Sequence, residues 1–327
     1  MNSPSRRAFV WRSTVLACAA ALASASVLAQ AYPDKPITFI VPFAAGSATD
    51  QLARALGQAV TEATKQQVIV DDKPGANAFI GAAAAARAPK DGYTVFITTN
   101  TTHAANEHLF KKLPYDPVKD FEPVTLLGRG GQIMVVNNSL PAANVQEFIK
   151  LAKSKPGKLT FGWGSSSSRI AGELFKQMTG TFIVSIPYRS NPPAVTDLMG
   201  GQIDMMITDM ATGLPQVKGG KLKALGVSTS KRSPLAPEIP TISEAGAKGY
   251  EMTYWFAAYV PAGTPAPVVA RLNEILVKAN KSGTAAKFYE PTGTEVLAST
   301  PEELRKFQAA ESQKWSKIIT AAGIEKE

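Results

Sequence analysis

Short apolar runs alternate along the chain with longer segments in which apolar residues recur every three or four positions. The short runs predict strands and the periodic segments predict amphipathic helices. The expected strands are 37–41, 67–70, 94–98, 124–127, 133–136, 159–161, 182–186, 203–207, 224–227 and 254–260. The expected helices are 79–87, 145–153, 170–178, 193–199 and 267–281, and a further one begins after the cap residue Thr300. This alternation predicts an α/β fold with doubly wound sheets.

The first strand leads into a helix through a loop that contains no lysine or arginine. Residues 42–48 form the loop, and Thr49 and Asp50 are expected to cap the helix that follows. Free backbone N–H groups at a helix start attract anions. Because the loop has no basic side chain, it would hold a carboxylate through backbone dipoles and hydroxyl groups.

The second half of the chain repeats this strand–loop–helix arrangement. Strand 159–161 enters the segment 162–169, which contains four consecutive serines, and a helix follows. Two such units, one in each domain, can place two helix starts across a cleft. Such a cleft has room for an acid group at each end of a ligand.

Residues 1–31 show the order of an export signal. Three arginines and no acid precede a small apolar run that ends in an A-x-A pattern, so cleavage is expected after Ala31 or, less favoured, after Ala29. The segment 5–9 also resembles a twin-arginine signal, although a general basic segment looks similar. The single cysteine, Cys18, lies inside the signal, where lipidation is the less favoured alternative. The sequence therefore predicts a periplasmic protein.

Length and charge narrow the functional classes. Removal of the signal leaves 296 of the 327 residues, more than one hydrophobic core usually serves, and two domains are expected. The net charge falls from +9 to +6 without the three arginines of the signal. The remaining basic residues occur singly or in pairs, so the pattern does not indicate nucleic-acid binding. A mildly positive field favours anionic ligands instead.

Eight short motifs follow one another along nearly the whole chain after residue 31. They are YPDKPI at 32–37, PFAAG at 42–46, TD at 49–50, PGA at 74–76, DGY at 91–93, LPYDP at 113–117, AGELF at 171–175 and PAGTP at 261–265. Together they resemble the Bug (TctC-like) periplasmic solute receptors. The resemblance implies a two-lobed Venus-flytrap fold of type II, served in some cases by a tripartite tricarboxylate transporter. The ligands it implies are di- and tricarboxylates, acidic amino acids and aromatic acids.

The resemblance also assigns two ligand loops. The first-domain loop falls on 43–50, with the candidate binding residues Phe43, Gly46, Ser47, Thr49 and Asp50. The second-domain loop falls on Ser165, Ser166, Ser167, Ser168 and Arg169. The chain departs from the family pattern, because Ser47 stands where a second glycine is usual and Arg169 where a histidine is usual. Arg169 adds a permanent, fork-shaped donor that suits bidentate binding of a carboxylate.

Further candidates follow strands or flank the loops, and each also has a structural interpretation. The candidates are Asn100 and Thr101 at a strand end, Tyr188, Arg189 and Asp209, and the aromatic residues Trp163, Tyr254 and Trp255. Large aromatic side chains more often pack in a core than stack on a ligand. Arg189 could be an exposed turn residue, and Asp209 could cap a turn. In the same way Phe43 could be core, the serines a flexible loop, and Arg169 a solvated cation.

Two enzyme classes fit the sequence less well than a receptor. The segment 162–167 resembles a dinucleotide loop, but Ser167 replaces the third glycine and residues 180–188 supply no acid for a ribose. For a hydrolase, no G-x-S-x-G motif occurs, and the two histidines, His103 and His108, share one segment. Their spacing does not make a metal-protease motif, so no metal and no cofactor is expected. A periplasmic hydrolase stays the alternative.

The sequence thus predicts an extracytoplasmic receptor and not an enzyme. Domain one would be 32–130 with 253–327, domain two would be 131–252, and the crossings near 128–130 and 253 would serve as the hinge. The aromatic residues and the added arginine are compatible with an aromatic dicarboxylate such as terephthalate, and also with aliphatic C4 to C6 acids. The expected partners are this small carboxylate and the integral-membrane subunits of a tripartite tricarboxylate transporter. The protein is expected to be monomeric.

Overall fold

The computed structural model describes residues 32–327, so the predicted signal at 1–31, with Cys18, lies outside the described residues. Within this range ten strands form one long sheet. They are β1 Ile37–Val41, β2 Val68–Asp72, β3 Thr94–Thr99, β4 Phe121–Asn137, β5 Thr160–Trp163, β6 Val184–Pro187, β7 Met205–Asp209, β8 Leu222–Val227, β9 Thr253–Pro261 and β10 Glu295–Val296. The order is β2-β1-β3-β9-β4-β7-β5-β6, and β8 and β10 also pair with β4.

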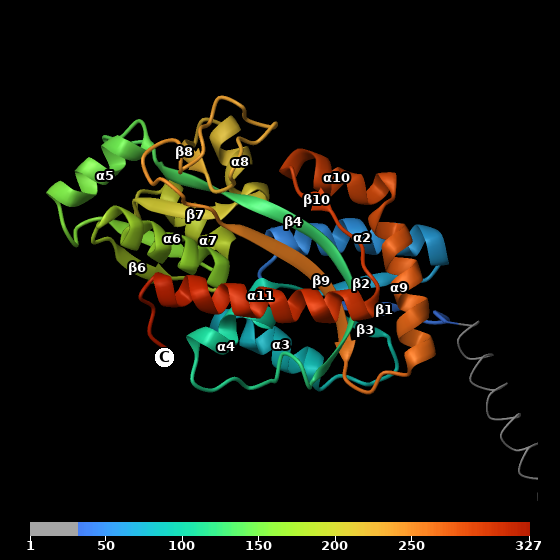
Figure 1. The fold of residues 1–327 in the computed structure, drawn as a ribbon. Coiled ribbons are helices and arrows are strands. Elements are labelled where there is room, and N and C mark those ends of the chain that lie inside the picture. The colour runs from blue at the N-terminus through green and yellow to red at the C-terminus, as the bar shows by residue number, and fades with distance from the viewer. Residues whose placement is uncertain (1–31) are drawn as a thin grey trace, which may run out of the picture.

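The sheet has a parallel group of strands at each end and two long strands that connect them. β1, β2 and β3 run parallel, and we call the part of the molecule built on them the first lobe. β5, β6 and β7 run parallel in the other part, the second lobe. The antiparallel strands β4 and β9 pass from one lobe to the other (Figure 1).

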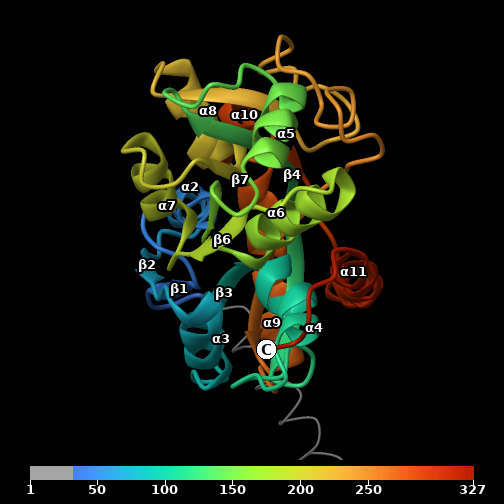
Figure 2. The same cartoon turned by 90° about the vertical axis from the view of Figure 1, so that its left-hand side faces the viewer.

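Helices cover the faces of both groups of strands, as parallel sheets require. They are α2 Ala48–Thr64, α3 Phe79–Ala86, α4 Asn106–Leu109, α5 Val145–Ser154, α6 Ser166–Thr179, α7 Asn191–Met199, α8 Met210–Lys218, α9 Ala266–Asn280, α10 Gly283–Thr292 and α11 Pro301–Ala321, with the short turns η1 Ala76–Ala78 and η2 Thr101–Ala105. The last helix, α11, contacts α4 of the first lobe and α6 of the second. Figure 2 shows α11 on one side of the molecule, beside both lobes.

Apolar residues of the sheet and of its covering helices form the core of both lobes. Leu52 and Leu56 of α2 are fully buried against first-lobe residues such as Phe39 on β1. In the second lobe, Ile170 and Phe175 of α6 are equally buried. Each lobe therefore has the packed sheet-and-helix core that fixes the ends of its strands and the starts of its helices.

Strand β4 corrects the expectation of two separate strands at 124–127 and 133–136. The glycines between these runs stay extended and pair with β9, with Gly130 opposite Tyr254 and Gly131 opposite Thr253. A Cβ atom on Gly130 would lie 2.5 Å from the Tyr254 hydroxyl oxygen. Close approach of this ring, and not a turn, therefore explains the glycine, and the predicted crossing at 128–130 lies inside a continuous strand.

Most of the other expected elements agree with the structure to within a few residues. The sequence pattern did not indicate helices α4, α8 and α10 or the two-residue strand β10. α8 contains Gly213 and Pro215, and α10 contains Gly283 and Pro291. Because glycine and proline have low helix propensity, packing against the rest of the protein overrides the local preference here. Among residues 32–327, each helix is either too short or too polar to cross a membrane.

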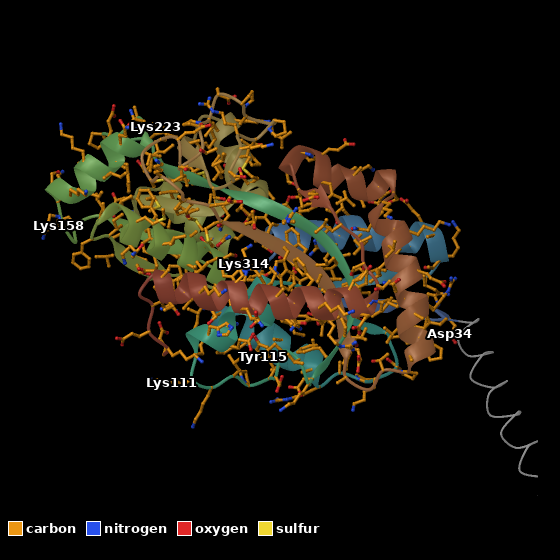
Figure 3. The ribbon with its side chains drawn as sticks, viewed as in Figure 1. Asp34, Lys111, Tyr115, Lys158, Lys223 and Lys314 are labelled. Carbon is orange, nitrogen blue, oxygen red and sulfur yellow. The ribbon has the colours of Figure 1, made fainter. Side chains whose placement is uncertain are left out.

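Basic side chains are dispersed over the molecule. Lys111 follows α4, Lys158 precedes β5 and Lys314 lies on α11 (Figure 3), and all three are exposed. The positive charge of the described part of the chain is therefore spread over separate elements of both lobes.

Candidate functional site

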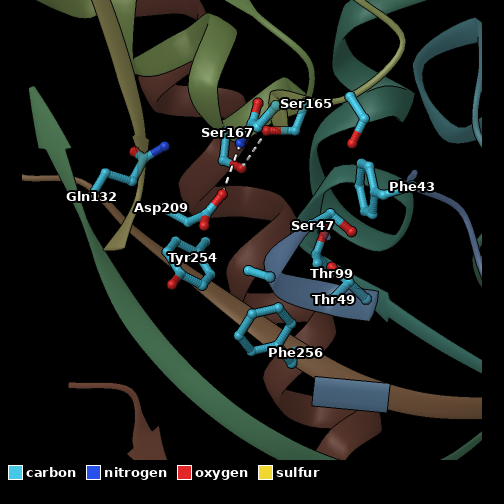
Figure 4. Close-up of a pocket in the computed structure, with 13 residues that line it drawn as sticks. Phe43, Ser47, Thr49, Thr99, Gln132, Ser165, Ser167, Asp209, Tyr254 and Phe256 are labelled. Carbon is cyan, nitrogen blue, oxygen red and sulfur yellow. Dashed lines mark hydrogen bonds between the residues drawn. The ribbon is translucent and has the colours of Figure 1, made fainter. Parts of the chain in front are cut away.

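A cavity lies between the lobes, where β1, β3 and β7 end (Figure 4). Both lobes and the two connecting strands line it: Phe43, Ser47, Ala48 and Thr49 after β1, Thr99 on β3, Gln132 on β4, Ser165, Ser167, Ser190, Asn191 and Asp209 at helix starts, and Tyr254 and Phe256 on β9. About 380 Å³ inside it, counting the open mouth, is filled by no protein atom. Ligands of open α/β sheets bind at such strand ends, and the volume suits a small molecule.

Four helices begin at the wall of this cavity. The residues Ser47, Ser165, Ser190 and Asp209 are the N-caps of α2, α6, α7 and α8, and all four line the cavity. The first backbone N–H groups of a helix have no partner within the helix, and the helix dipole makes this end positive. Four converging helix starts therefore form an environment for negative charge that uses no basic side chain.

Three polar atoms of the cavity wall are buried without a hydrogen-bond partner among the described residues. They are Oε1 of Gln132, Oγ of Ser190 and the hydroxyl of Tyr254. Buried polar groups are nearly always paired, because an unpaired one loses its interaction with water and gains nothing in return. A polar ligand in the cavity would supply these partners.

Tyr254 can act only as a neutral phenol at physiological pH. Burial raises the pKa of its hydroxyl well above the ordinary value of 10, and the negative charge of Asp209 raises this pKa further. The phenol proton is therefore retained and is available to a ligand oxygen.

Asp209 serves two roles at the second-lobe side. Its Oδ1 accepts hydrogen bonds from the Thr212 N–H at 2.8 Å and from the Thr212 hydroxyl. The first of these bonds makes Asp209 the N-cap of α8. Its Oδ2 accepts from the Asn191 side-chain amide at 2.9 Å. Among the described residues that line the cavity, Asp209 alone carries a formal charge. The carboxylate is thus held in place by α7 and α8 while it contributes a negative charge to the cavity.

The remaining wall is apolar and aromatic. Phe43 and Phe256 are both buried, and the ring of Phe256 packs edge-on against Tyr254 with centroids 5.2 Å apart. In Figure 4, Phe43 and Phe256 lie on the side where Ser47 and Thr49 also line the cavity. This wall suits the apolar body of a small acid.

The structure brings seven of the predicted candidate residues to the cavity wall. These are Phe43, Ser47, Thr49, Ser165, Ser167, Asp209 and Tyr254. They come from both strand–loop–helix units, from the end of β7 and from β9, so the two units do face one cavity. Whether these residues contact ligand stays a prediction.

Gly46 and Asp50 shape the first-lobe loop from outside the cavity wall. The N-cap of α2 is Ser47 and not Thr49 or Asp50, because the Ser47 Oγ accepts the Asp50 N–H at 3.3 Å and the helix begins at Ala48. Asp50 in turn accepts the Gly46 N–H at 2.8 Å and pairs with Arg54. The predicted cap at 49–50 therefore lies within the first helical turn.

Asn100, Thr101 and Ser168 also lie outside the cavity wall and make internal contacts. Asn100 accepts a hydrogen bond from the backbone N–H of Trp255 at 3.4 Å, and the Thr101 backbone N–H donates to Thr99 at 3.1 Å. The Ser168 hydroxyl donates to the carbonyl of Ile207 on β7. These contacts hold the strand ends that carry the cavity residues.

Ser166 connects the two lobes directly. Its hydroxyl donates to Asn106 Oδ1 at 2.7 Å and accepts from the Asn77 amide at 2.8 Å. Asn77 and Asn106 belong to η1 and α4 of the first lobe, whereas Ser166 begins α6 of the second. We call these three residues the lobe contact.

Arg169 does not line the cavity. Its guanidinium pairs with the Glu327 carboxylate and lies over the Trp163 ring, 5.1 Å from the ring centroid. Residues two apart on a helix point in different directions, which explains why Ser167 faces the cavity and Arg169 faces away from it. Glu327 in turn exchanges backbone hydrogen bonds with Leu109 and Lys111 beside α4.

Three further predicted residues lie near the second-lobe loop but not on the cavity wall. The Trp163 indole donates to the Ser185 hydroxyl at 2.6 Å, and the Tyr188 hydroxyl donates to Asp197 at 2.8 Å. Arg189 is exposed. Aromatic stacking at this cavity therefore depends on Phe43, Tyr254 and Phe256.

The sequence-based candidates omit several residues of the wall. The omitted ones are Ala48, Thr99, Gln132, Ser190, Asn191 and Phe256. Ser190 and Asn191 carried a usable signal, because a serine followed by Asn-Pro-Pro is a typical helix start. Gln132 gave none, since only the pairing of β4 with β7 brings it opposite Asp209.

The chain matches the model of a known protein family over residues 52–324, and that family is described as the tripartite tricarboxylate transporter family receptor. The chain belongs to this family. Protein BugT of Bordetella pertussis is 32% identical over 303 residues, which cover 92% of this chain and 93% of the relative. These matches confirm the resemblance to Bug (TctC-like) receptors.

Solved structures support the same conclusion. The R. palustris structure of Rpa4515 with adipate has a TM-score of 0.87 and 33% identity, and the match covers 90% of this chain and all of the other. The periplasmic binding protein BugD has a TM-score of 0.86 and 31% identity, with the same coverage. The predicted two-lobed α/β fold of periplasmic binding proteins is thus confirmed, and the family is one of solute-binding receptors.

Proposed function

We propose that the protein is a periplasmic receptor that closes its two lobes around a small carboxylate and delivers it to the membrane subunits of a tripartite tricarboxylate transporter. The observation that carries this proposal is the cavity wall, where four helix starts and three unpaired buried polar atoms face one space. Family membership and the adipate in Rpa4515 support a carboxylate as the ligand.

The ligand carboxylate would bind at the starts of α2 and α6. Ser47 and Thr49 from the first lobe and Ser165 and Ser167 from the second supply hydroxyl groups there. The two helix ends add backbone N–H groups and positive dipoles. The body of the ligand would lie against Phe43 and Phe256.

Both aromatic and aliphatic acids are candidate ligands for this wall. Terephthalate is a prediction from the sequence, and adipate is the ligand of the related Rpa4515 structure. Calorimetry with a panel of C4 to C6 diacids, aromatic acids and amino acids would test the proposal. Binding of one ligand per protein without product supports a receptor, whereas turnover of the bound acid would contradict it.

We also propose the two domains 32–130 with 253–327 and 131–252, with hinge segments in β4 and β9. β9 pairs with β3 of the first lobe, β4 pairs with β7 of the second lobe, and β4 and β9 pair with each other, so these two strands connect the lobes. Small changes in the backbone of a few residues at such crossings are enough for lobe closure. Export through the twin-arginine route and a monomeric state are parts of the same proposal. Mass spectrometry of the periplasmic form, with Tyr32 as the expected first residue, would test export.

A further inference from the structure

The cavity has two chemically different ends. In Figure 4, Gln132 and Asp209 lie on one side and Ser47, Thr49 and Phe43 on the other. Hydroxyl groups and helix starts dominate the second side, which suits an anion. The Gln132 and Asp209 side instead presents a carboxylate and an amide oxygen.

Gln132 and Asp209 are direct neighbours in the sheet. They lie opposite each other in the antiparallel pairing of β4 with β7, so their side chains start from adjacent positions. Oε1 of Gln132 is buried without a partner among the described residues, and it lines the cavity. Two oxygen acceptors therefore lie together at this end.

The carboxylate of Asp209 is held by hydrogen bonds at both of its oxygens. Both of its oxygens accept hydrogen bonds from N–H groups, of Thr212 and of Asn191, as an ionised carboxylate does. The contact from the Thr208 hydroxyl to Oδ2 is long, at 3.4 Å, so this oxygen retains capacity for a ligand donor. The Asp209 carboxylate itself occupies the N-terminus of α8, where the helix dipole stabilises negative charge. The N-termini of α2, α6 and α7 are then the ones that can interact with a ligand anion.

We infer that Asp209 and Gln132 form a subsite for a hydrogen-bond donor, and that the receptor prefers a small acid with an ammonium group at its far end over one with a second carboxylate. This inference rests on the proposed function. A second carboxylate would meet the negative charge of Asp209, and no basic side chain among the described lining residues offsets it. An ammonium group would satisfy both acceptors and would be attracted by the charge.

Two pairs of probes of matched length test the inference by calorimetry. They are 6-aminohexanoate against adipate and 4-(aminomethyl)benzoate against terephthalate. We expect the wild-type protein to bind the amino acid of at least one pair ten or more times more tightly than the diacid. Asp209→Asn, whose amide oxygen can still cap α8, should lower this ratio at least tenfold. Gln132→Leu should weaken the amino acid by a larger factor than the diacid, because it removes an acceptor that only the ammonium group can use.

Asp204→Asn is the matched control. Asp204 lies in the same lobe, accepts hydrogen bonds from the Thr160 N–H and hydroxyl, and does not line the cavity, so its substitution should leave the ratio unchanged. Thermal unfolding of each variant checks that it is folded. Tighter binding of the diacids by the wild type, or an unchanged ratio in folded Asp209→Asn, would overturn the inference while the proposed function stands. Failure of all carboxylates in the wider panel would overturn the proposed function itself.

Discussion

Ser47 has two hydrogen-bonding roles at the first-lobe end of the cavity. It caps α2, and its hydroxyl lines the cavity. Ser47→Ala should lower the free energy of unfolding by about 1 kcal/mol, the usual cost of a lost N-cap. It should also weaken carboxylate binding, because one hydroxyl donor is lost. Urea unfolding and calorimetry measure the two effects.

Thr300→Ala provides the control for Ser47→Ala. Thr300 caps α11 with a complete capping box and does not line the cavity. It should show a similar loss of stability with unchanged affinity. Equal affinities of the two variants would mean that the Ser47 hydroxyl does not contact ligand.

Arg169 has a different expected role from the one that its position in the sequence suggested. The sequence favoured Arg169 as the partner of a second ligand carboxylate, but the guanidinium contacts Glu327 and Trp163 outside the cavity wall. The Arg169 side chain is 12% exposed and pairs with Glu327 outside the cavity wall, so its loss cannot distinguish the two ends of a ligand. Arg169→Ala should therefore change the affinities for diacids and monoacids by the same factor. A selective loss of diacid binding in calorimetry would restore the sequence-based hypothesis.

His103 makes stability depend on pH. It is fully buried in η2, stacked on Tyr259 with centroids 3.9 Å apart, and burial lowers its pKa from 6.5 to about 3. Below pH 6.5 the unfolded chain binds a proton that the folded protein does not bind, so the free energy of unfolding falls by about 1.4 kcal/mol per pH unit as the pH decreases toward 3. His103→Phe, which keeps the stacking, should remove this slope.

Urea unfolding between pH 4 and pH 7 measures the contribution of His103. His108→Phe is the control, since His108 is only half-buried and bonds to Ser312. Identical pH profiles of the wild type and His103→Phe would contradict the expectation.

At the scale of elements, the pairing of β4 with β9 positions a residue of the cavity. Gly130 lets the Tyr254 ring lie against the β4 backbone, where a Cβ atom would come within 2.5 Å of the hydroxyl oxygen. Gly130→Ala should displace this ring, lower the free energy of unfolding by about 1–3 kcal/mol and weaken ligand binding. Gly283→Ala, at a position with open space around it, should do neither. Unfolding curves of both variants measure the change in stability, and calorimetry measures the change in ligand affinity.

Local patterns in the sequence predict some of the cavity residues and miss others. The strand–loop–helix units indicated Ser47, Thr49, Ser165 and Ser167, which line one cavity, because each unit is a local pattern of a few residues. Gln132 came from the long-range pairing of β4 with β7, which no local pattern encodes.

The direction of side chains was the second source of error. Arg169 directly follows the serines in sequence, yet the turn of α6 points it toward Glu327. Helices α8 and α10 escaped prediction because their glycines and prolines oppose helix formation locally.

At the scale of the whole molecule, the lobe contact of Asn77, Asn106 and Ser166 opposes opening. Ser166→Ala removes two hydrogen bonds between lobes and should favour the open form, which raises the dissociation constant severalfold without changing the cavity wall. Small-angle scattering should show a smaller radius of gyration on ligand binding, and Ser166→Ala should be more expanded without ligand than the wild type. Scattering curves unaffected by saturating ligand would contradict lobe closure.

Ser154→Ala is the control for the lobe contact. Ser154 ends α5, is exposed, and bonds only within its own helix in the described structure. It should leave both the scattering curve and the affinity unchanged.

The four helix starts at the cavity have a consequence for how such receptors diversify. Their positive ends are made by backbone groups, which substitutions other than those to proline leave in place. Side chains of the wall, in contrast, can be exchanged one at a time. Proteins that share this fold can therefore retain the site for one carboxylate, while substitutions at positions such as 132 and 209 change the specificity for the rest of the ligand. A change of ligand would then require few mutations, and each intermediate protein would still bind a carboxylate.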